Sequence, residues 1–403
     1  MKLRGKFAVW LMLLSPILQI YGWGQFDFAF LSTSLLGVYC FIRRDVNFKC
    51  LPEFLSKYII YWMCIHVISA TSISSMIPLG AIRCLITYAM FFSIIDYKYL
   101  VYVYKRIVFV CVMFFYVQFL LSFFFGYRLL GIIPYLPIAF TDDMALYTER
   151  FGIMNRPSSF FSEPAHFAQF IIPFLGIYLF ETNKKKRLKK ILFVVLALLL
   201  MQSGNALFGL SVLFIGYILS IVSQKKKNLL YIPLMIFGVL GIVNIYSDSY
   251  IGEKLLSRQV QISSNSYQDL GYSTSGFERI YRGYYIYSEY PFLRKVIGND
   301  NPDYKIAASQ KSLVAETFND NDLYFNTVQS ILLNTGIVGL LFFITGILGI
   351  WKKTNACGRS ILAVFITYSV MSAMYFSYTM CLYLIIPYFL HRRQDYETSI
   401  HLH

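Results

Sequence analysis

The stretch that decides the fold is residues 247–325. It contains GFERIYRGYYIYSEYP (residues 276–291), IGND (residues 297–300) and all but the last residue of NDNDLYFN (residues 319–326), and an apolar run over residues 327–350 follows at once. It is the one long polar interval of the chain and holds 18 of the 57 Lys, Arg, Asp and Glu residues. Because hydrophobic runs flank it on both sides, we expect a loop held at a membrane surface by the helices around it.

The composition is that of a membrane protein. The 403 residues are 57% hydrophobic and only 14% charged, with a mean hydropathy of +0.56, whereas a soluble domain is roughly 25% charged. A bilayer core of about 30 Å needs about 20 apolar residues per helix. The apolar runs are continuous and do not alternate with polar residues, which excludes a membrane β-barrel. The sequence therefore predicts an all-α polytopic membrane protein.

The apolar runs predict about 12 transmembrane helices in a single integral membrane domain over residues 1–403. The predicted spans are residues 7–23, 26–42, 57–78, 80–96, 106–126, 164–181, 191–203, 205–222, 229–246, 327–350, 360–375 and 377–390. The seventh and twelfth are short, so whether they fully cross is left open. The first has no small-residue cleavage site and is interpreted as a retained helix.

The basic residues predict the topology. With both termini in the cytoplasm, 24 of the 36 Lys and Arg residues and 6 of the 21 Asp and Glu residues face inside, as the positive-inside rule requires. The same scheme puts residues 127–163 and 247–325 on the outer face as two polar loops. The net charge of +15 then comes from topological anchors and does not indicate binding to nucleic acid. The KKKRLKK run (residues 184–190) is interpreted as a cytoplasmic connection.

Several kinds of site are not predicted. The seven cysteines form no CxxC pair, and the five histidines have no metal-ligand spacing, so neither a disulfide framework nor a metal site is expected. A P-loop or other nucleotide motif is also missing from the sequence, and no cofactor is predicted.

The first outer loop ends in a cluster of charged residues. Arg150, Arg156, Glu163 and His166 lie within 17 residues of one another. Pro164 suits the first turn of a helix, which places the Glu163 carboxylate where the helix dipole stabilises it. The alternative interpretation is an ordinary capped helix start with an interfacial histidine.

The large outer loop carries two further pairs. Arg279 and Arg282 are three residues apart in a predicted amphipathic helix and so share a face; two guanidinium groups suit a pyrophosphate. Surface salt bridges to acidic neighbours are the alternative. Asp320 and Asp322 stand just before the next apolar run, where either could bind sugar hydroxyls or take a proton. Helix capping is the alternative for these two.

The stretch RPSSFFSEPAHFAQF (residues 156–170) resembles the R-x-x-x-F-x-E-P signature of bacterial O-antigen and capsular polysaccharide polymerases of the Wzy type, with one more residue between the arginine and the Glu-Pro pair. Later features follow in the family's order: SGNALFGL (residues 203–210), FER (residues 277–279) in a large outer loop, IGND, and LYFNTVQSILLNTGIVGL (residues 323–340). The ending also resembles the related O-antigen ligases. Those carry a histidine where this chain has Phe325 and Asn326, which favours the polymerase.

This resemblance implies a GT-C-like fold and an inverting glycosyltransferase in the bacterial cytoplasmic (inner) membrane. The enzyme would join undecaprenyl-pyrophosphate-linked oligosaccharide repeat units at the outer face, with membrane lipid and a chain-length regulator as partners and without metal or cofactor. The implied catalytic residues are Glu163, Asp322 and Arg279. The implied substrate-binding residues are Arg156, Arg282, His166, Arg150, Asp320 and Asn326.

Two other functions remain open at this point. A ligase would transfer the finished glycan to another acceptor. A lipid-linked oligosaccharide flippase or another transporter also commonly has twelve spans, but we would expect its charges inside the bundle at membrane depth. Here the concentrated charges lie in two loops on one face, which favours chemistry at a surface.

Overall fold

A computed structural model describes residues 3–23, 26–72, 76–139, 157–180, 187–224, 278–312, 315 and 325–400. Within them the chain is largely helical, and each predicted span corresponds to one helix, except that residues 229–246 lie outside the described residues. The long helices are α1 (Leu3–Leu18), α2 (Phe28–Ile42), α3 (Glu53–Ser69), α4 (Leu79–Ile94), α5 (Tyr97–Phe125), α7 (Pro164–Phe180), α8 (Arg187–Leu200), α9 (Gly204–Gln224), α16 (Thr327–Lys353), α17 (Ala356–Met371) and α18 (Tyr378–Ile400).

The shorter elements connect these helices. They are β1 (Gly22–Trp23), β2 (Phe26–Asp27), η1 (Phe48–Cys50), the π-helical turn η4 (Glu278–Arg282), α13 (Gly283–Ser288), α14 (Phe292–Ile297) and α15 (Pro302–Ser309). β1 and β2 form an antiparallel pair.

The described helices have the composition of membrane spans. Three of them are long and apolar enough to cross a membrane: α5, α16 and the Gly204–Ile221 part of α9. Others, including α2, α4, α7 and α17, are shorter apolar helices. A helix of about 17 residues is roughly 25 Å long, somewhat less than a bilayer core of about 30 Å. The composition supports a helical membrane protein.

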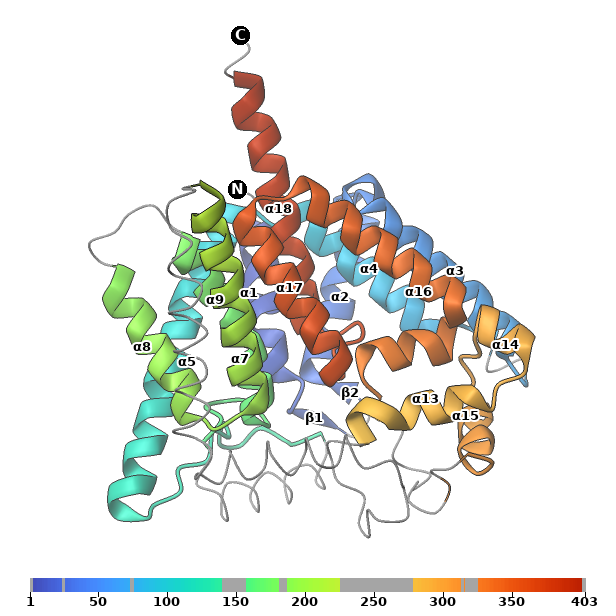
Figure 1. Cartoon of the computed structure of the whole chain (residues 1–403), viewed down its shortest axis with the longest axis horizontal. Coiled ribbons are helices and arrows are strands. Elements are labelled where there is room, and N and C mark those ends of the chain that lie inside the picture. The colour runs from blue at the N-terminus through green and yellow to red at the C-terminus, as the bar shows by residue number, and fades with distance from the viewer. Residues whose placement is uncertain are drawn as a thin grey trace.

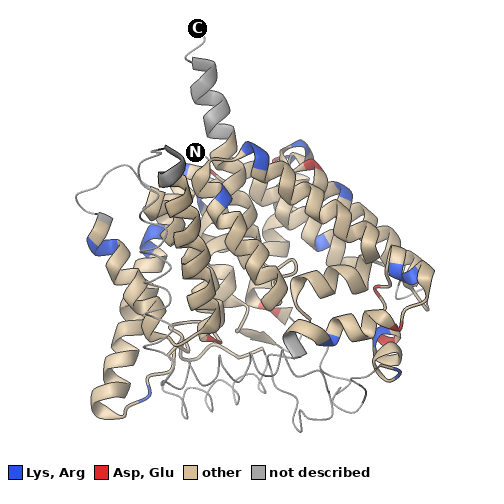
Figure 2. Ribbon diagram, in the orientation of Figure 1, with Lys and Arg blue, Asp and Glu red and all other residues tan. Residues whose placement is uncertain are grey.

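The bundle has two unlike ends (Figure 1). α1 begins and α18 ends at one end, called the terminal end here; β1, β2, α13 and α15 lie at the opposite end, called the loop end. Figure 2 shows many of the Lys and Arg residues at the terminal end, for example on the last turn of α16, which carries Lys352 and Lys353, whereas others lie on α14 and α15. At the loop end, Asn301 Nδ2 donates to the carbonyl of Ser69, which joins the α14–α15 connection to the last turn of α3.

Apolar side chains are exposed in stripes along the long helices. Their spacing of three, four or seven residues places each set on one helix face. On α5 the exposed set includes Val110, Met113, Val117 and Leu120, and on α16 it includes Ile337, Leu341, Ile344 and Leu348. Stripes of this size on the outside of a bundle mark a surface that contacts lipid or another apolar partner.

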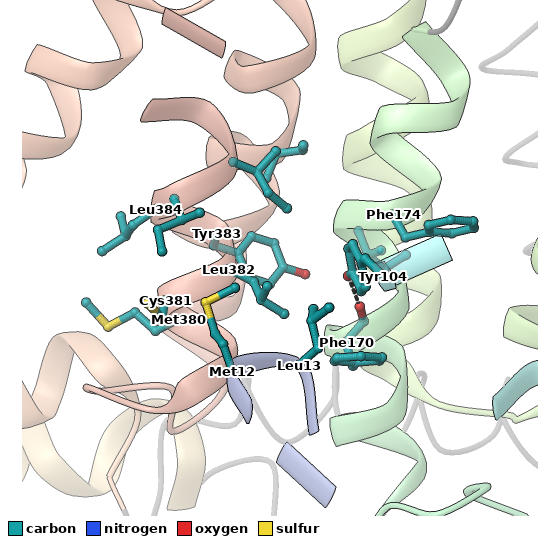
Figure 3. Packing of buried hydrophobic residues seen from close by; sticks show 14 of the residues in the cluster. Met12, Leu13, Tyr104, Phe170, Phe174, Met380, Cys381, Leu382, Tyr383 and Leu384 are labelled. Atoms are coloured by element: carbon teal, nitrogen blue, oxygen red, sulfur yellow. Dashed lines mark hydrogen bonds between the residues drawn. The ribbon is translucent and has the colours of Figure 1, made fainter. Parts of the chain in front are cut away.

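The core between the helices contains a proline compensated by a tyrosine. Pro173, inside α7, has no N–H to donate to the carbonyl of Gln169 one turn earlier. The hydroxyl of Tyr383 on α18 donates to that carbonyl instead, at 2.9 Å. Tyr104 of α5 donates in the same way to the carbonyl of Phe170, as Figure 3 shows. Two tyrosines from other helices thus fix the first half of α7.

Candidate functional site

A buried loop presents the start of α7. Ser158 and Ser159 are fully buried. The Ser159 backbone has a left-handed φ of 58°, and both its peptide groups bond to the Gln118 side chain of α5: Ser159 N donates to Oε1 at 2.8 Å, and Nε2 donates to the Ser159 carbonyl at 3.3 Å. Ser159 therefore holds the loop against α5, a structural role that the sequence pattern did not reveal.

Glu163 and His166 lie at the point where α7 begins. Pro164 is the first residue of the helix, as predicted, and the Glu163 carbonyl accepts from Phe167 N at 3.2 Å. His166 Nδ1 lies 2.9 Å from Ser162 Oγ. Both side chains are half-buried. A partly exposed carboxylate and imidazole at a helix N-terminus can bind and orient a polar substrate.

The start of α16 is joined to α17 by capping bonds. Asn326 Oδ1 accepts from Gln329 N at 2.9 Å, Gln329 Oε1 accepts from Asn326 N at 3.3 Å, and Asn326 Nδ2 donates to the Val370 carbonyl at 2.8 Å. This is a capping box. Asn326 therefore has a structural role that the prediction of substrate binding did not include.

The same hydrogen bonds extend to α9. Thr327 N and Oγ1 both donate to the Ser372 carbonyl, and Asn205 Nδ2 donates to Ser372 Oγ at 2.9 Å. Tyr368 of α17 donates to the Asn205 carbonyl at 2.6 Å, and the missing side chain of Gly209 makes room for its ring. The start of α9, the end of α17 and the start of α16 are thus one connected unit at the loop end.

Arg282 lies against this unit. It is 3% exposed, so it is not a surface residue. Gln329 Nε2 donates to the carbonyl of Ile280 at 2.8 Å, and a Cβ on Gly283 would lie only 2.7 Å from the Gln329 side chain. Gln329 therefore joins the turn that carries Arg282 to the start of α16, which Asn326 caps.

The helix predicted around the arginine pair needs a correction. Residues 278–282 form a π-helical turn, and the α-helix α13 begins only at Gly283. The wider turn means that residues three apart no longer lie above one another as in an α-helix. Arg150, Arg156, Asp320 and Asp322 lie outside the described residues, as does the side chain of Arg279. Their predicted roles stay predictions.

A second polar cluster at the loop end was not predicted. His66 Nδ1 lies 2.7 Å from Asp300 Oδ2, Trp62 Nε1 donates to the same oxygen at 2.9 Å, and Lys305 Nζ lies 3.8 Å from Oδ1. Burial lowers the pKa of the Lys305 ammonium, and the Asp300 carboxylate partly offsets this. The sequence IGND shows that residue 300 is an acidic residue, but nothing in the sequence indicates that it contacts a histidine of α3.

Two glycines place Asp300 in this cluster. Gly298 (φ 87°) and Gly336 (φ 64°) approach each other where α16 is kinked, and a Cβ on Gly298 would lie 2.5 Å from the Asn334 carbonyl. Asn299 N donates to the Leu333 carbonyl at 2.8 Å. The turn before α15 is thereby held against the kink, and Asp300 faces α3.

Neither polar cluster includes a metal-ligand set in the part of the chain that the structure describes, where no three His, Cys, Asp or Glu side chains gather. Comparison of the chain with protein-family models, with curated proteins and with solved structures gives no match. The activity is therefore inferred from the residues and their arrangement.

Proposed function

We propose that this protein joins lipid-linked oligosaccharide repeat units at the outer face of the bacterial cytoplasmic membrane. One observation carries the proposal: the start of α7, which carries Glu163 and His166, and the turn η4, which carries the buried Arg282, lie at the same loop end of an apolar helical bundle, while many of the Lys and Arg residues lie at the terminal end (Figures 1 and 2). The terminal end would then face the cytoplasm. The resemblance of residues 156–170 to the polymerase signature supplies the reaction.

The proposed reaction is an inverting glycosyl transfer. A hydroxyl of one repeat unit attacks the anomeric carbon of the growing chain, and undecaprenyl pyrophosphate leaves. Negative charge grows on the leaving oxygen, so guanidinium groups fixed beside it lower the barrier. Arg279 and Arg282 are assigned this role, with Arg156 and Arg150 binding the same phosphates. The bond that breaks is already activated, so no nucleotide is needed at the site.

Carboxylates are assigned to the acceptor hydroxyl. Glu163 at the start of α7, or Asp322 before α16, orients the acceptor hydroxyl or takes its proton. His166, Asp320 and Asn326 are assigned to sugar hydroxyls. The Asn326 side chain has less capacity to bind a sugar hydroxyl, because it already caps α16 and donates a hydrogen bond to α17.

Replacement of Glu163 by glutamine tests the proposal in cells. The change is nearly isosteric and removes only the charge, so the protein should reach the membrane normally. Loss of a general base or of a carboxylate that orients the substrate commonly lowers a rate by about 10²–10⁴-fold, so cells should display single repeat units and few long chains. Glu53→Gln is a matched control, because Glu53 is also a glutamate at the start of a helix, but of α3 and at the terminal end.

The same experiment separates the alternatives. A flippase defect would leave repeat units on the cytoplasmic side with no surface glycan, and a ligase defect would leave long chains on the lipid carrier. Either pattern from Glu163→Gln would contradict the proposal. A glycan distribution equal to that of the wild type would show that Glu163 only caps the helix.

A further inference from the structure

A histidine and an aspartate from distant parts of the chain form a close pair at the loop end. His66 Nδ1 lies 2.7 Å from Asp300 Oδ2, and the His66 side chain is 29% exposed whereas that of Asp300 is 11% exposed. A carboxylate only accepts hydrogen bonds, so Nδ1 is the donor, and the lone pair of the neutral ring belongs to Nε2. Among the described residues, Nε2 has no hydrogen-bond partner. Nε2 of the partly exposed His66 ring can therefore accept a proton.

The aspartate is itself held in place from several sides. Trp62 Nε1 donates to the same carboxylate oxygen at 2.9 Å, and Lys305 Nζ lies 3.8 Å from the other one. The backbone before it is fixed by the contact of Gly298 with the α16 kink. A carboxylate anchored in this way keeps the imidazole in one tautomer and orientation and stabilises the imidazolium that forms when the ring accepts a proton.

Two buried polar groups between α13 and α15 lack a hydrogen-bond partner in the ranges that the structure describes. The hydroxyl of Tyr290, a residue that is 2% exposed, and Nη1 of Arg294 are buried and have no hydrogen-bond partner within the described part of the chain. Burial raises the pKa of Tyr290, and Tyr304, Asp300 and Arg294 also act on it, so each of these three lies within electrostatic reach of the Tyr290 hydroxyl. Buried polar groups in folded proteins are nearly always hydrogen-bonded. Two unpartnered groups together therefore point to a polar ligand.

We infer that this cluster receives the acceptor sugar and that His66 is the general base of the transfer. This inference rests on the proposed function. The Nε2 lone pair takes the proton of the acceptor hydroxyl while its oxygen forms a bond to the anomeric carbon of the donor. The bond from that carbon to the phosphate oxygen breaks, and its electron pair leaves with undecaprenyl pyrophosphate. The imidazolium then returns the proton to water.

In this assignment, different residues at the loop end bind the pyrophosphate and the acceptor sugar. Arg282, on the turn that leads into α13, lies near the start of α16 and serves the pyrophosphate. His66 and Asp300, at the far end of the α13–α15 segment, serve the acceptor. Glu163 then orients a substrate hydroxyl and is not the base.

The test uses purified full-length protein and purified lipid-linked repeat units, with polymer formation followed as a ladder on a gel. His66→Asn keeps a donor for Asp300 and so keeps the bridge between α3 and the loop, but it removes the base. We expect its rate to fall by about 10²–10⁴-fold with the thermal unfolding midpoint unchanged. His391→Asn, a histidine on α18, is the control. If His66→Asn fails to reach the membrane, Asp300→Asn carries the same expectation.

A purely structural bridge would behave differently. The rate of His66→Ala should be restored in part by added imidazole, and across a series of substituted imidazoles it should rise with their basicity. Wild-type rates from His66→Asn, or rescue that does not depend on basicity, would overturn the assignment while leaving the polymerase proposal standing. If the wild type builds no ladder where a known polymerase does, both fall.

Discussion

Gly298 and Gly336 hold two backbone segments in direct contact. A Cβ on Gly298 would lie 2.5 Å from the Asn334 carbonyl oxygen, and one on Gly336 would lie 2.6 Å from Gly298 N. Gly336 also has a φ of 64° and a ψ of −166°, a combination that only glycine adopts without strain. This contact kinks α16 and places Asp300 beside α3.

Alanine at either glycine should therefore destabilise the loop end. We expect Gly336→Ala to lower the free energy of unfolding by about 1–3 kcal/mol, from the strained backbone and the steric overlap together. Thermal unfolding in detergent measures the change. Gly349→Ala is the matched control, because Gly349 lies on the same helix and a Cβ on it would have nothing within 4 Å. Equal unfolding midpoints for the two variants would contradict this account of the kink.

Arginine at position 279 should not be replaceable by lysine. A guanidinium binds pyrophosphate through paired N–H groups, which a lysine ammonium cannot copy although it keeps the charge. Because a hydrogen bond to a charged group contributes about 1.5–3 kcal/mol, we expect Arg279→Lys to slow polymerisation by about 10–100-fold. The glycan ladder, corrected for protein level, measures this. Arg359→Lys, at the terminal end, is the control, and a normal ladder from Arg279→Ala would remove Arg279 from the site.

The two ends of the bundle should face opposite sides of the membrane. In a background without the seven native cysteines, Lys311→Cys should react with an impermeant thiol reagent in intact cells, and Lys353→Cys should not. Both lysines are exposed, at the loop end and at the terminal end respectively. The charge pattern extends the prediction to Asp142 outside and to Lys186 and Lys226 inside. Labelling of position 353 in intact cells would reverse the topology.

Lys305 should make stability depend on pH. Burial lowers its pKa from the ordinary 10.5, so the unfolded chain binds this proton more tightly than the folded chain does. The free energy of unfolding therefore rises with pH between the lowered pKa and 10.5. We expect the unfolding midpoint of the wild type to rise relative to that of Lys305→Met as the pH approaches about 10. Lys311→Met, an exposed position, should show no such trend, and a constant difference for Lys305→Met would refute the prediction.

The helices were predictable because lipid requires apolar runs, but their ends were not. α5 was expected at residues 106–126 and begins at Tyr97, since Asp96 caps it by accepting from Tyr99 N at 3.1 Å. Hydropathy cannot show that a charged turn continues a helix. For α3 the predicted span was too long at its end: it was expected to reach residue 78, but the helix ends at Ser69.

The candidate site was predictable only where its residues are close in sequence. Glu163, Pro164 and His166 could be placed at one helix start because local rules govern that start. The pairing of His66 with Asp300 spans 234 residues and depends on a kink at Gly336 that the sequence pattern does not specify. The capping role of Asn326 likewise became visible only with its bonds to α17.

The most direct test of the proposed function is the reaction itself. Purified wild-type protein in detergent or liposomes is given lipid-linked repeat units, without nucleotide or added metal, and the products are separated by size. The proposal predicts a ladder of polymers that grows with time and is absent when Glu163→Gln replaces the wild type. Unchanged single repeat units from the wild type, under conditions in which a known polymerase makes polymer, would contradict it.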